Sequence, residues 1–471
     1  MTELCMLSAV RLAAMMRQGE VSAREVMMAH LARIEAINPK VNAIVTLVAD
    51  DALAAADAAD ARRARGEALG PLHGLPVAHK DLQPTRGIRT TFGSRIYADN
   101  IPTEDALIVE RLRAAGAITV GKTNTPEFGA GSQTFNAVFG ATRNPYALDR
   151  TCGGSSGGAA VALRCGMVPI ADGTDLGGSL RNPANFCNVV GLRPSYGRVP
   201  SVPTRYPWST LSVAGPMARS VADCALMLSA IAGPDRRAPL SIEEDGTHFA
   251  DRLERDFRGT RVAWAADLGG TLPIQPEIVA TLERARPAFE GLGCMLEPAM
   301  PDLTGADLIF MNLRGFLFAL NYGELLDRHR DKMKETVIWN IDVGLRLSGA
   351  DIVRAEQLRA ALFQRCNEFF RRYEFLVMPV NQVVPFPVDE EYPRMIDGQA
   401  MRDYLEWMRS CYYISVTGHP AISVPCGFTA EGLPVGVQIV GRYRDERGVL
   451  ELAHAFEQAT RHGERVPQSL A

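Results

Sequence analysis

The sequence lacks a long hydrophobic run. No segment approaches the roughly 18 consecutive apolar residues that a membrane-spanning helix requires. The first 16 residues carry Glu3 and Arg11 among their apolar side chains, which is not the pattern of a secretory signal peptide. These absences predict a protein without a membrane partner, and the expected location is the cytoplasm.

Cysteine is sparse and scattered along the chain. The nine cysteines are odd in number and form no C-x-x-C pair, so neither a disulfide framework nor a zinc site is indicated. No cluster of histidine, cysteine and aspartate has the spacing of metal ligands. Cys152 has no obvious base among its neighbours, and we interpret it as structural. We therefore expect no metal ion and no cofactor.

The chain also lacks a strong charge of either sign. Its 50 basic and 54 acidic residues give a net charge of −4, which does not suggest nucleic acid or an anionic membrane as a partner. The length alone would suggest about three domains. No internal repeat, low-complexity segment or long linker marks a boundary between them.

Helical patterns alternate with short apolar strands. Ser22 and Glu25 form a capping box that predicts a helix to about residue 36, stopped by Asn38-Pro39. Strands are predicted at residues 75–78 and 117–120, with a helix over residues 104–115 between them. The same alternation at residues 261–297 predicts a strand–helix–strand unit. This order indicates an α/β fold.

Residues 151–181 contain two glycine-rich serine clusters. A segment of small apolar residues, 159–165, separates them and predicts a tightly packed helix, and a short buried strand follows at residues 168–171. A run such as residues 175–179 can turn several N–H groups toward one point, which is how an anionic oxygen is held. Two serines on such loops suggest acyl-transfer chemistry.

Residues 153–157 match the G-x-S-x-G nucleophile elbow of α/β-hydrolases. That motif requires a buried strand that runs directly into the serine. The preceding residues, 143–150, read as a polar turn with no strand. We therefore reject the elbow interpretation.

Lys80 directly follows the strand predicted at residues 75–78. It lies 75 residues before Ser155, which in turn lies 24 residues before Ser179. Around these positions stand the motifs GGSSGG, GTDLGGSLRNPA, VVGLRPSYGRVP and KTNTPEFG, with PAISVPCG and LPVGVQIVGR toward the C-terminus. With this set of motifs the sequence resembles the amidase signature hydrolases over nearly its full length.

The resemblance implies a fold and an organisation. The fold class is α/β, as one large domain over residues 1–471 with a central mixed β-sheet covered by helices on both faces. The catalytic core is expected at about residues 70–220, and helices that form the substrate pocket at about residues 300–420.

The resemblance also implies a Ser-Ser-Lys triad. Ser179 would be the nucleophile, Lys80 the base, and Ser155, after a cis Gly154–Ser155 peptide bond, the proton relay between them. The oxyanion hole would be formed by backbone N–H groups of Leu176, Gly177, Gly178 and Ser179. Ser156 and Thr174 would form loop hydrogen bonds.

Lys80 must be neutral to act as a base. Burial and the absence of a nearby carboxylate would disfavour its charged form. Asp81 is adjacent, but neighbouring strand residues point to opposite faces. His79 and His419 are alternative bases without any further sequence signal. Asp175 and Arg181 are predicted to form a structural ion pair.

Aromatic and long apolar residues are dense at residues 309–322, 337–347 and 404–413. The first two segments are interpreted first as core helices, and the resemblance adds a role in the acyl and leaving-group pockets. The last segment is expected to be an aromatic helix that closes the site. These segments are apolar and aromatic and carry no clustered positive charge, which predicts apolar or aromatic substrates rather than glutamine. The candidate substrate-binding residues are Gly129, Ala130, Phe316, Trp339 and Tyr404.

The expected function is hydrolysis of small to medium, apolar or aromatic amides through an acyl-enzyme on Ser179, extending to carbamates (urethanes) and esters. Urethanase and aryl acylamidase activities fall within this range. The alternative is the A subunit of a glutamyl-tRNA amidotransferase complex, which would pass ammonia from glutamine to a partner. A catalytically idle binding protein is disfavoured by the intact triad. For the hydrolase we expect a monomer or homodimer with a small-molecule substrate.

Overall fold

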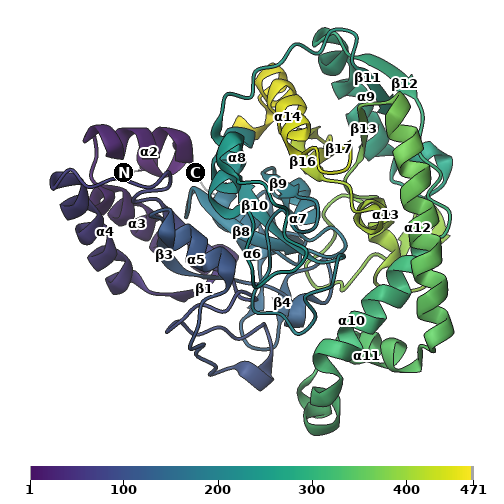
Figure 1. The fold of residues 1–471 in the computed structure, drawn as a ribbon, viewed down its shortest axis with the longest axis horizontal. Coiled ribbons are helices and arrows are strands. Elements are labelled where there is room, and N and C mark those ends of the chain that lie inside the picture. The colour runs from purple at the N-terminus through teal and green to yellow at the C-terminus, as the bar shows by residue number, and fades with distance from the viewer. Residues whose placement is uncertain (1, 468–471) are drawn as a thin grey trace.

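Eleven strands form one mixed sheet through the middle of the molecule (Figure 1). The computed structural model describes residues 2–467. From one edge to the other the strands are β1 (Ile44–Leu47), β3 (Ile118–Thr123), β2 (Pro76–Lys80), β8 (Ile170–Asp175), β10 (Val213–Ala218), β9 (Val190–Arg193), β16 (Ala421–Phe428), β17 (Pro434–Gly441), β13 (Phe375–Pro379), β11 (Arg261–Trp264) and β12 (Met295–Pro298).

The strand directions are mixed. β2 runs parallel to both β3 and β8, and β11 runs parallel to β12 and β13. β10, β9, β16 and β17 are joined by antiparallel pairings. Strands β2, β9, β10, β13, β16 and β17 are buried along nearly their whole length, and their sequences are accordingly mostly apolar without a regular alternation of polar and apolar residues.

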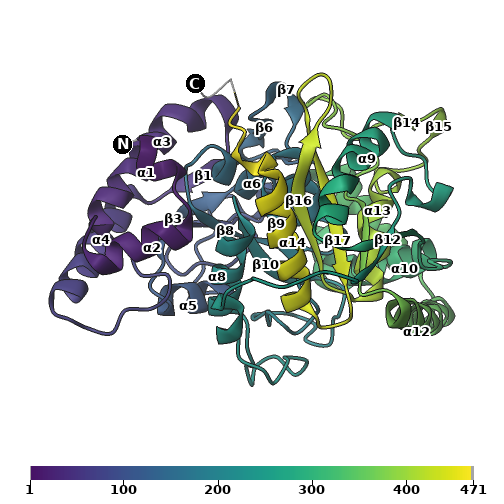
Figure 2. The same cartoon turned by 90° about the horizontal axis from the view of Figure 1, so that it is seen from above.

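Helices flank the sheet, as Figure 2 shows from above. Helices α8, α9 and α14 pack together over the strands, and α6 packs against α7. The helices are α1 (Thr2–Met6), α2 (Ala9–Gln18), α3 (Ala23–Val41), α4 (Ala49–Ala64), α5 (Leu107–Ala114), α6 (Gly157–Arg164), α7 (Arg181–Phe186), α8 (Val221–Ile231), α9 (Pro276–Gly291), α10 (Ala306–His329), α11 (Glu335–Arg346), α12 (Gly349–Arg372), α13 (Arg409–Thr417) and α14 (Glu446–Thr460). The predicted α/β class with a central mixed sheet is confirmed.

Three two-stranded sheets lie outside the central one. They pair β4 (Phe135–Asn136) with β5 (Gly140–Ala141), β6 (Arg143–Asn144) with β7 (Ala147–Thr151), and β14 (Met395–Ile396) with β15 (Gln399–Ala400). The expectation of no strand before the first serine cluster was wrong, because β7 ends at Thr151. β7 belongs to its own hairpin rather than to the central sheet, and its charged residues Asp149 and Arg150 reach the surface.

Helix α3 continues past the predicted stop at Asn38-Pro39 and ends at Val41. Pro39 has no N–H to donate to the carbonyl four residues earlier, but it lies in the last turn, so this loss weakens only the end of the helix. The actual end is set by Asn42 in the left-handed conformation and by the Asn38 side chain, which accepts the N–H groups of the next two residues, Ala43 and Ile44. Side-chain capping therefore decides where this helix ends.

The segment at residues 242–256 is acidic in composition but is anchored at three apolar side chains. Ile242, Phe249 and Leu253 are buried, and the short 3-10 helix at residues 247–250 packs against α8. The charged residues between them remain at the surface. The acidic composition of this segment does not indicate that three of its apolar side chains are buried.

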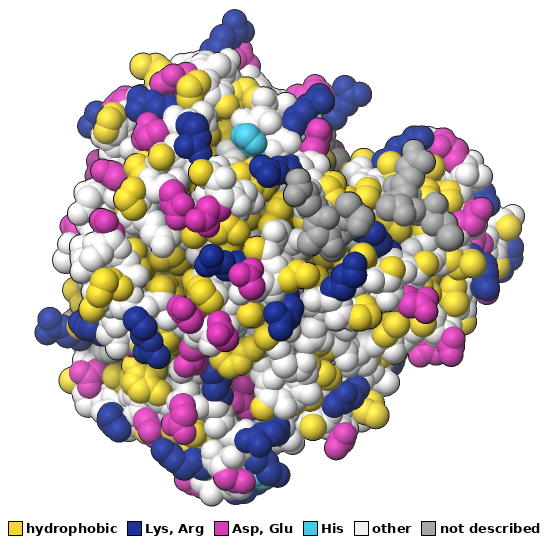
Figure 3. Space-filling view, turned by 180° about the vertical axis from the view of Figure 1, so that it is seen from behind, with side chains coloured by type: hydrophobic (Ala, Val, Ile, Leu, Met, Phe, Trp, Pro, Cys, Tyr) yellow, Lys and Arg dark blue, Asp and Glu magenta, His cyan; other side chains and the backbone are white. Residues whose placement is uncertain are grey.

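The surface carries both signs of charge. On the face seen in Figure 3, lysine and arginine side chains are interspersed with aspartate and glutamate. Within residues 2–467 no helix combines the length and the apolar character needed to cross a bilayer.

Helices α10 and α11 cross in close backbone contact at two glycines. A Cβ built on Gly344 would lie 2.0 Å from the carbonyl oxygen of Gly315 and 2.7 Å from Ala319 Cβ. Both atoms belong to α10 and cannot move aside without separating the helices. The crossing therefore requires glycine, and it fixes α11 against the helix that forms one wall of the site described below.

We predict that Gly344→Ala lowers the free energy of unfolding by about 1–3 kcal/mol, because added volume in a close-packed contact forces the backbones apart. Gly323→Ala is the matched control, since Gly323 lies in α10 and a Cβ added there would have no atom within 4 Å. Alanine there should stabilise the helix by up to about 1 kcal/mol. Equal effects of the two variants in chemical denaturation would contradict the close-contact interpretation.

Candidate active site

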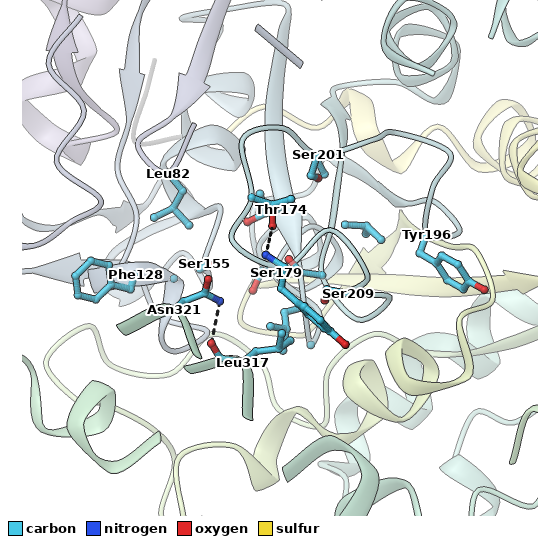
Figure 4. Close-up of a pocket in the computed structure, with 18 of the residues that line it drawn as sticks. Leu82, Phe128, Ser155, Thr174, Ser179, Tyr196, Ser201, Ser209, Leu317 and Asn321 are labelled. Carbon is cyan, nitrogen blue, oxygen red and sulfur yellow. Dashed lines mark hydrogen bonds between the residues drawn. The ribbon is translucent and has the colours of Figure 1, made fainter. Parts of the chain in front are cut away.

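A cavity of about 320 Å³ opens where the two serine clusters meet. Ser155 and Ser179 both line it, and Figure 4 shows them at the centre of the view, with Leu82 and Phe128 on one side and Tyr196 on the other. The sequence had predicted that these two serines belong to one site, and the fold brings them together from separate loops.

Lys80 lies beneath the serines at the end of β2. Its side chain is fully buried, and Nζ donates to Ser155 Oγ at 2.7 Å, Ser156 Oγ at 2.9 Å and Thr174 Oγ1 at 2.8 Å. All three neighbours are hydroxyl groups, which can act as donors or as acceptors. A neutral amine, which donates two hydrogen bonds and accepts one, can therefore be satisfied by the same three groups.

The pKa of Lys80 is lowered to about 7, because burial removes the charged form from water. Asp172 and Asp175 oppose this effect and raise the pKa, so the expectation of no nearby carboxylate was wrong. Asp172 accepts the backbone N–H of Lys80 at 2.9 Å and pairs with His79 Nδ1 at 2.5 Å. Neither carboxylate hydrogen-bonds to Nζ, and desolvation prevails.

Asp81 turns away from Lys80, as the alternation of strand side chains predicted. Its carboxylate accepts the Thr91 hydroxyl at 2.5 Å and the Thr91 backbone N–H at 3.1 Å. The two histidines considered as bases also lie elsewhere. His79 is held by Asp172 and Thr119, and His419 stacks on an aromatic ring in the core, where burial lowers its pKa to about 4.

The first serine cluster leads from the β6–β7 hairpin into α6. The Gly154–Ser155 peptide bond is cis, as the resemblance implied, and α6 begins at Gly157, two residues earlier than predicted. A Cβ on Gly157 would lie 2.3 Å from Thr134 Oγ1 and 2.6 Å from Cys152 Sγ. Cys152 packs there as a buried thiol, and burial raises its pKa to about 12, in keeping with a structural role.

The second cluster is shaped by the carboxylate of Asp175 at the end of β8. It accepts the backbone N–H groups of Gly178 at 2.8 Å and Leu180 at 3.2 Å, and pairs with Arg181 Nε at 3.0 Å. The predicted Asp175–Arg181 pair is thus present. Arg193 Nη1, also at 3.0 Å, is a second cation on the same carboxylate that the sequence analysis missed. Both arginines are buried, so the ion pairs that fix this loop lie in the interior of the protein.

The four expected oxyanion donors are not equivalent. The N–H of Gly178 is already bonded to Asp175, whereas in the described part of the chain Leu176, Gly177 and Ser179 have no acceptor for theirs. A Cβ on Gly177 would lie 2.7 Å from the ring of Phe310, so glycine is needed for the loop to lie against α10. Three N–H groups beside the cavity are therefore available for an anionic oxygen.

The five candidate substrate-binding residues are spread over different layers. Gly129 lines the cavity, where a Cβ would lie 3.4 Å from Ser155 Oγ. Ala130, Phe316, Trp339 and Tyr404 do not line it. Phe316 packs on the ring of Tyr206, and Trp339 on that of Tyr404, which places these rings behind the wall rather than in it.

The aromatic segments split between core and wall in the same way. Phe318 and Tyr322 of α10 line the cavity, while Phe310 stacks on Tyr412 with ring centroids 4.1 Å apart. The helix predicted at residues 404–413 is a short 3-10 helix, Glu406–Met408, followed by α13, and Met408 alone of residues 404–413 lines the cavity. Helical spacing in the sequence could not say which side of each helix faces the opening.

Two parts of the wall were not expected from the sequence. The first is the loop at residues 196–212, which contributes many lining residues but has no periodic pattern that could have revealed it. The second is Arg314 on α10, the one charged residue among those that line the cavity. Within residues 2–467 no group of three or more histidine, cysteine, aspartate or glutamate side chains could hold a metal ion.

Comparisons with known proteins identify the family. The model of the amidase family matches residues 25–450. The chain is 39% identical to an acylamidase of Rhodococcus erythropolis, over 96% of this chain and 95% of the relative. It is 35% identical to the A subunit of the glutamyl-tRNA(Gln) amidotransferase of Moorella thermoacetica, over 99% of each chain.

Solved structures show the same architecture. A bacterial aryl acylamidase of the amidase signature family has a TM-score of 0.91 and 29% identity, covering 98% of each chain. The 6-aminohexanoate cyclic dimer hydrolase has a TM-score of 0.89 and 26% identity, covering 99% of this chain and all of that one. By sequence and by fold, the chain belongs to the amidase signature family of amide-hydrolysing enzymes.

Proposed function

We propose that this enzyme hydrolyses small to medium, apolar or aromatic amides through an acyl-enzyme on Ser179, with Lys80 as the base. One observation carries the proposal. Lys80 is a fully buried lysine whose pKa is lowered to about 7, and its Nζ hydrogen-bonds only to hydroxyl groups, one of them Ser155. A lysine in this setting can accept a proton near neutral pH.

The residues suggest the following steps. Ser179 Oγ attacks the amide carbonyl carbon and gives its proton to Ser155, whose own proton passes to Lys80 Nζ. The carbonyl oxygen becomes an anion held by the N–H groups of Leu176, Gly177 and Ser179. The proton then returns along the same path to the amine nitrogen, the C–N bond breaks, and water repeats the sequence on the ester.

The substrate class follows from the walls of the cavity. Leu82, Phe128, Leu317, Phe318 and Tyr322 present apolar surface around the two serines. An apolar lining of this kind is complementary to the aryl and alkyl groups of a substrate. The acylamidase and aryl acylamidase among the similar proteins are named for such substrates. The same serine chemistry extends to carbamates (urethanes) and esters, since both present a carbonyl carbon to the nucleophile.

The second candidate is the A subunit of a glutamyl-tRNA amidotransferase. It is favoured by the end-to-end similarity to a protein of that name. Glutamine carries an α-ammonium group, which a binding site normally meets with a carboxylate. None of the residues that line the cavity is aspartate or glutamate. We therefore prefer the hydrolase of apolar amides.

The first prediction concerns pH. Because the neutral form of Lys80 is the base and its pKa is about 7, kcat/KM for an anilide should rise with pH and level off above about pH 8. Asp172→Asn removes a negative charge that raises this pKa, so the rise should move to lower pH. A profile that is flat from pH 5 to 9 in the wild type would contradict Lys80 as the base.

Lys80→Met is the companion variant for the pH series, since methionine is apolar and similar in length. This variant should lower kcat/KM for an amide by orders of magnitude, and its kcat/KM should no longer rise with pH. The loss should be smaller for an activated ester, whose leaving group needs no proton. Lys80→Arg should not restore activity, because guanidinium stays charged at working pH.

The second prediction identifies the nucleophile. Ser179→Ala should lower kcat by about a thousandfold or more while leaving the folded structure unchanged by circular dichroism. A serine-directed phosphonate should label Ser179 in the wild type, as read by peptide mapping, and should label nothing in the variant. Labelling at Ser155 instead would identify Ser155 as the nucleophile and Ser179 as the proton relay.

The third prediction separates the two candidate functions. The purified chain should hydrolyse an acyl anilide with a higher kcat/KM than glutamine, because the cavity offers apolar walls and no carboxylate for an ammonium group. Ammonia release from both substrates gives a common measurement if a primary aryl amide replaces the anilide. Glutamine as the better substrate would support the amidotransferase function.

A further inference from the structure

Arg314 is placed on the cavity-facing side of α10. Only 4% of its surface is exposed, and it lines the cavity together with Leu317, Phe318 and Asn321, which follow it by three, four and seven residues along the same helix face. Figure 4 shows Leu317 and Asn321 on this wall, below the two serines. A buried guanidinium thus belongs to the same cavity as Ser179.

The contacts of Arg314 are all with neutral groups. Nε donates to Asn340 Oδ1 at 2.8 Å, and Nη2 donates to the Tyr404 hydroxyl at 2.9 Å. The guanidinium carbon lies 4.6 Å from the ring centroid of Phe318 and 5.8 Å from that of Phe310. Among the described residues nothing accepts a hydrogen bond from Nη1, and no carboxylate is paired with any of its nitrogens.

Other buried arginines have either a carboxylate or backbone carbonyl oxygens as partners. Arg181 and Arg193 share the carboxylate of Asp175, and Arg198 pairs with Glu446. Arg164 and Arg219 have no carboxylate, but each donates to two or more backbone carbonyls. A buried charge is costly unless it is paired and hydrogen-bonded. Arg314 is therefore an under-compensated cation with one amino group still available.

The cavity contains nothing else that could neutralise this charge. Its lining includes no aspartate, glutamate, lysine or histidine, so Arg314 gives it a net charge of one positive unit. An apolar cavity with a single buried cation is complementary to a ligand that is mostly apolar and carries one negative group. A second charge of the opposite sign on the ligand would find no partner.

We propose that Arg314 binds a carboxylate on the substrate, so that the preferred substrates are apolar amides that carry a remote carboxylate and no ammonium group. Nη1 can donate to the carboxylate while Nε and Nη2 keep their bonds to Asn340 and Tyr404, which fix the plane of the guanidinium. This inference rests on the proposed function and narrows it. It also gives Tyr404 a role as a positioning residue behind the wall.

The test compares matched substrates. Mono-anilides of dicarboxylic acids with four to six carbons place the carboxylate on the acyl side, and 4-acetamidobenzoate places it on the amine side. The methyl ester of each acid is the neutral partner. For at least one pair, wild-type kcat/KM should favour the carboxylate by about 10- to 100-fold, the size of a charge-assisted hydrogen bond.

Arg314→Met should abolish this preference and bring the ratio of kcat/KM for the two partners of a pair to within about threefold of one, because the ratio cancels any loss that the two substrates share. Arg314→Lys should restore part of it. Arg205→Met is the matched control, because Arg205 does not line the cavity and pairs with Glu324 at the surface. It should keep the wild-type preference.

Two outcomes would overturn the role of Arg314. One is a wild type that shows no carboxylate preference in any pair while still hydrolysing the neutral anilides, which leaves the proposed function intact. The other is an Arg314→Met enzyme in which kcat/KM falls by the same factor for both substrates of a pair. Arg314 would then only hold α10 and α11 together. Calorimetric binding of the same carboxylates to Ser179→Ala reports on Arg314 even if no amide is turned over.

Discussion

The burial of Lys80 is the constraint on which the site depends. A lysine in water holds its proton at neutral pH, and only a desolvated one can accept a proton there. The fold places Lys80 at the end of β2, between β3 and β8, and covers it with α6 and two loops. Hydroxyl groups then satisfy Nζ without supplying a negative charge, which a carboxylate in direct contact would have done.

Two carboxylates nevertheless lie close by, and each is kept occupied. Asp172 binds the Lys80 backbone and His79, and Asp175 binds two arginines and two N–H groups of the serine loop. Both carboxylates therefore fix the position of the backbone around Lys80 through these hydrogen bonds and ion pairs. The same bond from Asp175 to Gly178 decides which N–H groups remain available beside Ser179. Lys80 and the loop that carries Ser179 are therefore coupled through one buried carboxylate.

Much of the cavity wall comes from parts of the chain outside the two serine clusters. The loop at residues 196–212 and helix α10 contribute about half of the residues that line the cavity. They can vary without disturbing the bonds around Lys80, because neither of them supplies one of those bonds. This separation gives a physical reason why related proteins with the same fold are named for different amides.

The sequence by itself determined the α/β class, most strands and helices, and the residues of the two serine clusters. Glycines and serines at fixed positions, and a lysine at a strand end, are local signals that need no knowledge of the folded state. Capping was read correctly at Ser22 but not at Asn38, where a side chain bonds to residues beyond the predicted end of the helix.

Tertiary structure alone decided which groups face the cavity and how they are charged. Phe318 lines it and Phe316 does not, although both are aromatic residues of one helix, because only the crossing of α10 with its neighbours orients the helix. The pairing of Asp172 with His79 and the uncompensated Arg314 likewise join residues far apart in the chain. A pKa, a hydrogen bond and a face of a helix depend on distances in space, which spacing along a sequence does not contain.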